Sequence, residues 1–267
     1  MRTIVTLVSS ITITIILSAF RSSNMLKGLA SLIPNASKTS RSSVDAAMSH
    51  TTSGQPVHIV LVGDSIFDNE VYVGRSGKSV IKHLNDKIPT EWKASLIAID
   101  GDVVEGVIRR QIGRIPKDAT HIFLSIGGND ALGAQGVTSK SVGSVAEALI
   151  ALSAVRKRFK NSYDEMLKQL LKLKLPTTIC TIYNPSYGDS PQQTVASMGL
   201  TALNDAIIEA ALRNHLPVID LKTMFSSPKD YANPIEPSTQ GGDKITDAIM
   251  RIMNNYDFNS QKTEIFA

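Results

Sequence analysis

The sequence predicts an α/β protein with a parallel sheet of five strands that is covered by helices on both faces. Two patterns along the chain lead to this fold class. Short apolar runs of strand length alternate with longer stretches of helical spacing, and the alternation occurs five times. The runs are apolar at nearly every position, as in residues 57–62, which is typical of strands buried on both faces. Such repeats favour a parallel sheet with right-handed crossovers.

The elements can be placed in order along residues 56–258, which we expect to form one domain, followed by a short C-terminal tail at 259–267. The expected strands are residues 57–62, 94–99, 120–126, 177–183 and 217–221. The expected helices are residues 78–88, 103–112, 144–175, 195–214 and 242–254. Pro89 and Pro176 end two of these helices, because proline has no N–H for the helical hydrogen bond.

The composition is that of an ordinary globular protein, with 42% apolar and 19% charged residues among 267. It excludes a disordered chain, a collagen-like fibre and a polytopic membrane protein. Cys180 is the only cysteine, so a disulfide framework and a cysteine-based zinc site are excluded as well.

The net charge of +4 comes from the N-terminal segment rather than from the domain. Residues 1–44 hold five basic residues and no acidic one, which leaves 23 basic and 24 acidic residues in the rest of the chain. A protein that binds nucleic acid should carry its positive charge on the folded domain. We therefore expect no nucleic-acid partner.

Residues 1–20 are interpreted as a signal peptide or a membrane anchor. The apolar stretch 4–20 lies between Arg2 and Arg21, and it is short for a spanning helix of about 20 residues. An organelle transit peptide is a third interpretation and is favoured less. Residues 21–55 are Ser-rich and lack periodicity, which predicts a disordered linker. We expect a secreted or membrane-anchored protein, with the N-terminal segment as the candidate for membrane association.

Polar residues and glycines follow each of the first three expected strands. The three loops read Gly63-Asp64-Ser65, Asp100-Gly101-Asp102 and Gly127-Gly128-Asn129-Asp130. Taken singly, each is explained by turn or helix-cap chemistry. Taken together, they lie at the strand ends where open α/β sheets bind ligands. They supply a hydroxyl nucleophile, a closely approaching backbone N–H and an amide donor, which acyl transfer needs to attack a carbonyl and to hold the oxyanion.

These loops resemble the sequence blocks of the SGNH hydrolase superfamily, also called GDSL esterases and lipases. Gly63-Asp64-Ser65 matches the first block, Gly101 the second and Gly128-Asn129-Asp130 the third, and the resemblance covers about residues 56–256. It implies a flavodoxin-like three-layer α/β/α sandwich. It also implies a hydrolase that acts on small-molecule, glycan or lipid esters without a cofactor or a metal.

The resemblance further implies roles for individual residues. Ser65 is the expected nucleophile, and its backbone N–H, the N–H of Gly101 and the side chain of Asn129 are the expected oxyanion hole. Gly106 is the competing glycine of the second block. The residues expected to support the loops are Asp64, Gly128 and Asp130.

The fourth block departs from the family pattern Asp-x-x-His-Pro. Asn233 and Glu236 stand at the Asp and His positions, and no histidine follows His215. The five histidines fall in the linker, within helices or strands, or at the opposite end of the expected sheet, so none is expected to replace the missing base.

Two interpretations of this departure remain. In the first, Glu236 is the general base, with a pKa raised toward neutrality by a dry site, and Asn233 replaces an Asp that a carboxylate base does not need. In the second, Glu236 is a surface residue and the domain is a catalytically inactive module that binds a ligand. The intact Ser65, Gly101 and Asn129 favour the first interpretation.

Overall fold

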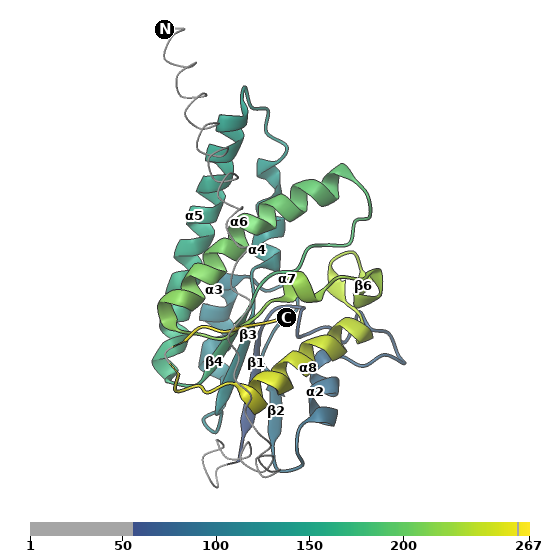
Figure 1. Cartoon of the computed structure of the whole chain (residues 1–267), viewed down its shortest axis with the longest axis vertical. Coiled ribbons are helices and arrows are strands. Elements are labelled where there is room, and N and C mark those ends of the chain that lie inside the picture. The colour runs from purple at the N-terminus through teal and green to yellow at the C-terminus, as the bar shows by residue number, and fades with distance from the viewer. Residues whose placement is uncertain (1–55, 261) are drawn as a thin grey trace, which may run out of the picture. The chain divides into compact units, whose positions relative to one another are not determined.

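The computed structural model describes residues 56–260 and 262–267, which form a parallel sheet with helices on both faces (Figure 1). The expected signal peptide or anchor and the expected linker lie outside the described residues. The strand order in the sheet is β2-β1-β3-β4-β5-β8. The strands are β1 (His58–Gly63), β2 (Lys93–Leu96), β3 (His121–Ser125), β4 (Thr177–Cys180), β5 (Val218–Ile219) and β8 (Ile265–Phe266).

The strand order places a crevice beside β1. The chain moves outward from β1 to β2, and then crosses back so that β3 pairs with the other side of β1. The connections after β1 and β3 therefore leave in different directions, which opens a crevice at the carboxyl ends of these strands. The three polar loops of the sequence follow β1, β2 and β3, so the topology brings them to one edge of the sheet.

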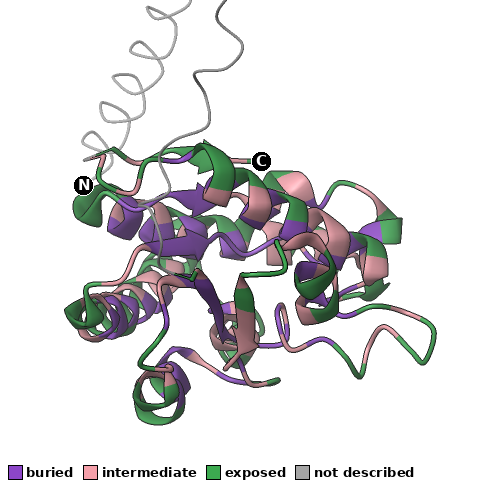
Figure 2. Ribbon diagram, turned by 90° about the horizontal axis from the view of Figure 1, so that it is seen from below, coloured by how far each residue is buried: buried purple, intermediate pink, exposed green. Residues whose placement is uncertain are grey.

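The helices divide the core into two layers, one on each face of the sheet. The first includes α3 (Val104–Gly106), α5 (Val145–Leu170) and α6 (Pro191–Asn214), and the second includes α2 (Val80–Lys87) and α8 (Thr239–Asn255). Successive residues of β1 alternate between the two cores, and all six are buried. Figure 2 shows the buried strands between the two layers of helices. The predicted α/β sandwich is therefore confirmed.

The predicted number of strands is wrong, because the sheet has a sixth strand within the expected C-terminal tail. β8 pairs in parallel with β5, and the N–H groups of Val218 and Asp220 donate to the carbonyl oxygens of Glu264 and Phe266 at 2.8 and 2.7 Å. These hydrogen bonds satisfy backbone N–H groups along the outer edge of β5. A strand of two residues has no periodicity, so the sequence pattern did not reveal it.

Several predicted helix boundaries also differ from the structure. The helix expected at 103–112 is divided into α3, a π-helical turn at Val107–Gln111 and a 3-10 turn at Ile112–Arg114. The long helix α5 ends at Leu170, before a 3-10 turn. α6 begins earlier than expected, because Ser190 caps it by accepting from the N–H of Gln193 at 3.1 Å.

Among the described residues, α6 is the one helix long and apolar enough to cross a membrane by length and composition. Its inner face packs into the first core through Leu203, Ile207 and Ala210. Burial against the sheet explains the apolar residues on this inner face of α6.

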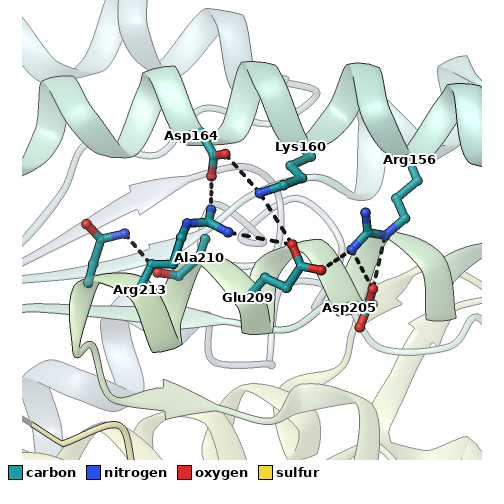
Figure 3. A network of polar contacts seen from close by, with 8 residues as sticks. Arg156, Lys160, Asp164, Asp205, Glu209, Ala210 and Arg213 are labelled. Atoms are coloured by element: carbon teal, nitrogen blue, oxygen red, sulfur yellow. Dashed lines mark hydrogen bonds and ion pairs between the residues drawn. The ribbon is translucent and has the colours of Figure 1, made fainter.

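A network of ion pairs joins α5 to α6 (Figure 3). Arg156 binds Asp205, and Asp164 binds Arg213, so the two partners in each pair lie 49 positions apart in the sequence. Glu209 lies in the centre and contacts Arg156, Lys160 and Arg213 at 2.5, 3.3 and 3.5 Å. The network holds the C-terminal halves of the two helices together.

We expect Glu209→Gln to lower the midpoint of urea unfolding at low ionic strength, because the carboxylate of Glu209 pairs with three cations. The loss should shrink in molar NaCl, which screens exposed charges. Urea denaturation measures both values. Glu165→Gln is the matched control, since Glu165 makes a single 3.8 Å pair with Lys168. An equal loss in the control would contradict the central role of Glu209.

Candidate active site

Ser65 lies in a tight turn directly after β1. Gly63 ends the strand with a φ of +136°, and the N–H of Asp64 donates to the carbonyl oxygen of Ser125 at the end of β3. The N–H groups of Phe67 and Asp68 then both donate to the carbonyl oxygen of Asp64 at 3.1 Å. This turn fixes Ser65 at the edge of the sheet, where the residue is 6% exposed.

Glu236 reaches Ser65 from a small antiparallel hairpin formed by β6 (Tyr231–Asn233) and β7 (Glu236–Pro237). The side-chain oxygen of Asn233 accepts from the N–H groups of Ile235 and Glu236 at 3.0 and 3.1 Å, which holds the turn. Asn233 therefore positions the backbone of Glu236 rather than bonding to its carboxylate.

Two residues from elsewhere in the fold anchor this hairpin. The hydroxyl of Tyr183 donates to the carbonyl oxygen of Ile235 at 2.6 Å, and the amide of Asn69 donates to that of Pro237 at 3.2 Å. Asn69 also accepts from the N–H of Val80 at the start of α2. The hairpin is thus tied to the loop after β1, which carries Ser65.

The hydroxyl of Ser65 donates a hydrogen bond to Oε1 of Glu236 at 3.2 Å. Glu236 is 6% exposed, and its Oε2 is buried without a hydrogen-bond partner. Burial raises the pKa of Glu236 to about 7, against the lowering effect of the Ser65 bond, and the charge of Asp100 adds to the rise. At neutral pH this carboxylate can therefore accept a proton and return it.

Asn129 lies at the start of α4 (Gly128–Gly133), after Gly127 with a φ of +125°. Its side-chain amide donates to the carbonyl oxygen of Asp102 at 2.9 Å, in the loop after β2. An amide has two N–H groups, so the second remains available to a ligand in the crevice. The bond to Asp102 fixes the direction of that second donor.

The two glycines that compete for the second block have different surroundings. Gly101 has a φ of +76° and lies exposed on the loop after β2, adjacent to Asp102. Gly106 is buried, and a Cβ there would overlap the carboxylate of Asp102. The close approach of Asp102 thus explains why position 106 is a glycine. Gly101 remains the candidate backbone donor to the oxyanion, together with the side chain of Asn129.

The carboxyl groups of Asp64 and Asp130 bind loop backbone. Asp64 accepts from the N–H of Ile66, and Asp130 accepts from the N–H of Val104, both at 3.1 Å. Burial raises the pKa of Asp64 to about 8 and also raises the pKa of Asp130. These contacts hold the backbone of the loop after β1 and of the segment at the start of α3.

Gln111 is a residue of the site region that sequence reasoning missed. Its amide nitrogen donates to the carbonyl oxygen of Gly63 at 2.7 Å and to the carboxylate of Asp102 at 2.6 Å. Its amide oxygen accepts from the N–H of Gly63 at 2.8 Å. Gln111 thus connects the end of β1, before Ser65, to the residue that holds Asn129. Gln111 follows Arg109 and Arg110, so no feature of the sequence set it apart as a residue of the site.

None of the four described histidines lies at the site. His58 is buried and bonds to Ser95, and His83 faces Asp243 on α8. His121 opens β3, and His215 follows α6 at the opposite end of the sheet. Within residues 56–260 and 262–267, moreover, no three His, Cys, Asp or Glu side chains gather to hold a metal ion.

A cavity of about 570 Å³ extends from Ser65, Asn129 and Glu236 between α4, α5 and α6. Most of its lining side chains are apolar, and they include Leu132, Val137, Leu152, Val155, Leu200 and Leu203. Gly101 is not among its lining residues. A cavity of this size beside a buried hydroxyl and carboxylate is suited to a small-molecule ligand.

Comparison with known proteins bears on the family and the fold of the chain. A sequence model of the GDSL-like lipase/acylhydrolase family matches residues 61–243, which is more than half of the chain. Comparison with curated protein sequences gave no match.

Solved structures of lipases and esterases share the fold. An extracellular lipase from Streptomyces rimosus is 16% identical, with a TM-score of 0.53, over 74% of this chain and 98% of its own. The lipase Lip_vut3 from a goat rumen metagenome is 17% identical, with a TM-score of 0.59, over 75% and 99%. The acetyl xylan esterase AlAXEase is 15% identical, with a TM-score of 0.55, over 73% and 98%. At these identities the likeness establishes the fold alone.

We expect Gly63→Ala to cost several kcal/mol of unfolding free energy, because a Cβ there would overlap the carbonyl oxygen of Ser125 at a φ that side chains rarely adopt. Chemical denaturation measures the loss. Gly113→Ala is the control, since its Cβ meets no atom within 4 Å, and it should stay within about 0.5 kcal/mol of the wild type. Similar stability for the two variants would contradict the close approach of β1 and β3.

Proposed function

Since this chain belongs to the GDSL-like lipase/acylhydrolase family, we propose that it hydrolyses carboxylic esters through an acyl-enzyme on Ser65, with Glu236 as the general base. The observation that carries this proposal is the 3.2 Å hydrogen bond from the Ser65 hydroxyl to a carboxylate removed from water. A carboxylate whose pKa lies near 7 matches the pH at which it would work.

The first step forms the acyl-enzyme. Oγ of Ser65 attacks the ester carbonyl carbon while its proton moves to Oε1 of Glu236. The carbonyl oxygen becomes an oxyanion, which accepts from the second N–H of Asn129 and from the backbone N–H groups of Ser65 and Gly101. The tetrahedral intermediate then loses the alcohol, and Glu236 returns the proton to the departing oxygen.

The second step releases the acid by the reverse chemistry. A water molecule gives its proton to Glu236 and attacks the acyl carbon, and the same donors hold the second oxyanion. When this intermediate collapses, Oγ of Ser65 leaves and takes the proton back from Glu236. Unlike an imidazole, the carboxylate needs no partner to fix a tautomer, which agrees with an Asn at position 233 that bonds only to backbone.

We expect a fluorophosphonate probe to label the wild-type protein, because this reagent needs an activated serine, and we expect Ser65→Ala to abolish the labelling. Gel fluorescence with mass mapping of the labelled peptide is the measurement. Ser139→Ala is the matched control. Ser139 also lines the cavity, but it is exposed and makes no hydrogen bond to a carboxylate or a histidine. Failure of the folded wild type to react would instead support a non-catalytic ligand-binding module.

The pH dependence tests Glu236 separately. The base must be ionised, so kcat/KM should rise with pH through about 7 and then level off. Glu236→Gln should lower kcat at least 100-fold, on the order expected for loss of a general base, and should remove this rise. Stopped-flow or plate assays with p-nitrophenyl acetate give both values.

Glu91→Gln is the control for this change, because Glu91 is exposed and lies on the loop before β2. It should keep the wild-type profile. A Glu236→Gln variant with nearly wild-type turnover would refute the Ser65–Glu236 pair while leaving the hydrolase assignment in place.

A further inference from the structure

We propose that the cavity beside Ser65 binds the acyl chain of a medium- or long-chain fatty acyl ester, and that Gly199 determines the length of chain accepted. This inference rests on the proposed esterase function and specifies its substrate class. It is carried by the shape and lining of the cavity and by an unusual glycine in α6.

The chemistry of the cavity wall favours an apolar chain. No Lys, Arg or His lines it, and its only acidic residues are Asp64 and Glu236, both beside Ser65. Away from Ser65, Leu and Val side chains of α4, α5, α6 and the segment after α4 form the apolar part of the wall. The neutral polar side chains there are Gln135, Thr138, Ser139, Tyr187 and Gln192. A phosphate would meet no cation on this wall, and a sugar would leave many of its hydroxyl groups against Leu and Val side chains, whereas a hydrocarbon chain would release ordered water from them.

The cavity lies where α5 and α6 move apart. Arg156 and the residues after it are joined to α6 by the ion-pair network, whereas the cavity is lined by Leu152 and Val155 of α5 and by residues 191–203 of α6. Figure 1 shows the N-terminal part of α6 leaning away from α5. The ion pairs thus close one end of the space between the helices and leave the other end open.

Gly199 lines this space at the middle of α6, where glycine is unfavourable relative to alanine. Neither of the usual reasons for glycine applies. It does not have the positive φ found at Gly63 or Gly127, and a Cβ built on it meets no atom within 4 Å. The missing side chain therefore contributes open volume to the cavity rather than relieving a clash.

The rim of the cavity is also apolar. Val195 lines the cavity and is 48% exposed, and Met198, three residues later on α6, is 64% exposed. Leu149, three residues before the cavity-lining Leu152 on α5, is 61% exposed. An acyl chain that enters from this side would remain in contact with apolar side chains on its way to Ser65.

The test compares p-nitrophenyl acetate, butyrate, octanoate and decanoate, each below its micellar concentration. For the wild type, kcat/KM should rise by up to about fourfold per methylene until the cavity is filled. Gly199→Leu should lower the octanoate-to-acetate ratio of kcat/KM at least tenfold, because the leucine occupies the acyl site. A wild type that prefers acetate, or an unchanged ratio in Gly199→Leu, would overturn the proposal.

Two more measurements test the acyl site against two alternatives. One alternative is a general effect of a larger side chain on α6, and the other is that the cavity binds the alcohol group. Thr194→Leu adds a similar side chain to the exposed face of α6 and should keep the wild-type ratio, with thermal unfolding as the check on folding. Octyl acetate compared with ethyl acetate tests whether the cavity holds the alcohol instead. A strong preference for octyl acetate that Gly199→Leu removes would assign the cavity to the alcohol and overturn the acyl assignment.

A binding measurement separates this inference from the proposed catalysis. In the Ser65→Ala background, calorimetric titration with 1-octanol should detect binding that Gly199→Leu weakens at least tenfold. If the wild type fails to react with the fluorophosphonate but this binding is found, the catalytic proposal fails and the apolar chain site stands. If Ser65 is labelled but octanol does not bind, the acyl site is wrong and the hydrolase stands.

Discussion

The chemistry proposed for the hydrogen bond between Ser65 and Glu236 depends on the burial of Glu236, which is 6% exposed. In water, a glutamate with an ordinary pKa is a poor base for a serine hydroxyl at neutral pH. Here the hairpin that carries Glu236 is held against the loop after β1 by Asn69 and Tyr183. The carboxylate is thereby buried, and burial brings its pKa close to 7.

The opposite side of the crevice is organised by a second set of buried polar groups. Gln111 bonds to both backbone groups of Gly63 and to the carboxylate of Asp102, whose carbonyl oxygen holds the amide of Asn129. The ends of β1, β2 and β3 are thus joined by hydrogen bonds. Such a network fixes donors in place before a substrate arrives, which is what stabilisation of a developing negative charge requires.

A glutamate that acts as the base at position 236 would make different demands on its neighbours from those of a histidine. An imidazole base needs a partner that selects its tautomer and orients the ring. A carboxylate has two equivalent oxygens, so the fold has to supply backbone position and low polarity instead. Asn233 supplies the first through its bonds to the N–H groups of Ile235 and Glu236, and the closed hairpin supplies the second.

The sequence by itself determined the α/β class and the loops that carry Ser65 and Asn129, because these depend on local periodicity and on short motifs at strand ends. Glu236 became a candidate through the resemblance of its segment to the fourth block of the family. The sequence could not reveal β8, which is a strand only because β5 has an open edge. It also could not reveal the role of Gln111 or the space beside Gly199, since both depend on which distant residues are brought near. The distance from Ser65 to Glu236, 171 residues apart in the chain, was decided by tertiary packing alone.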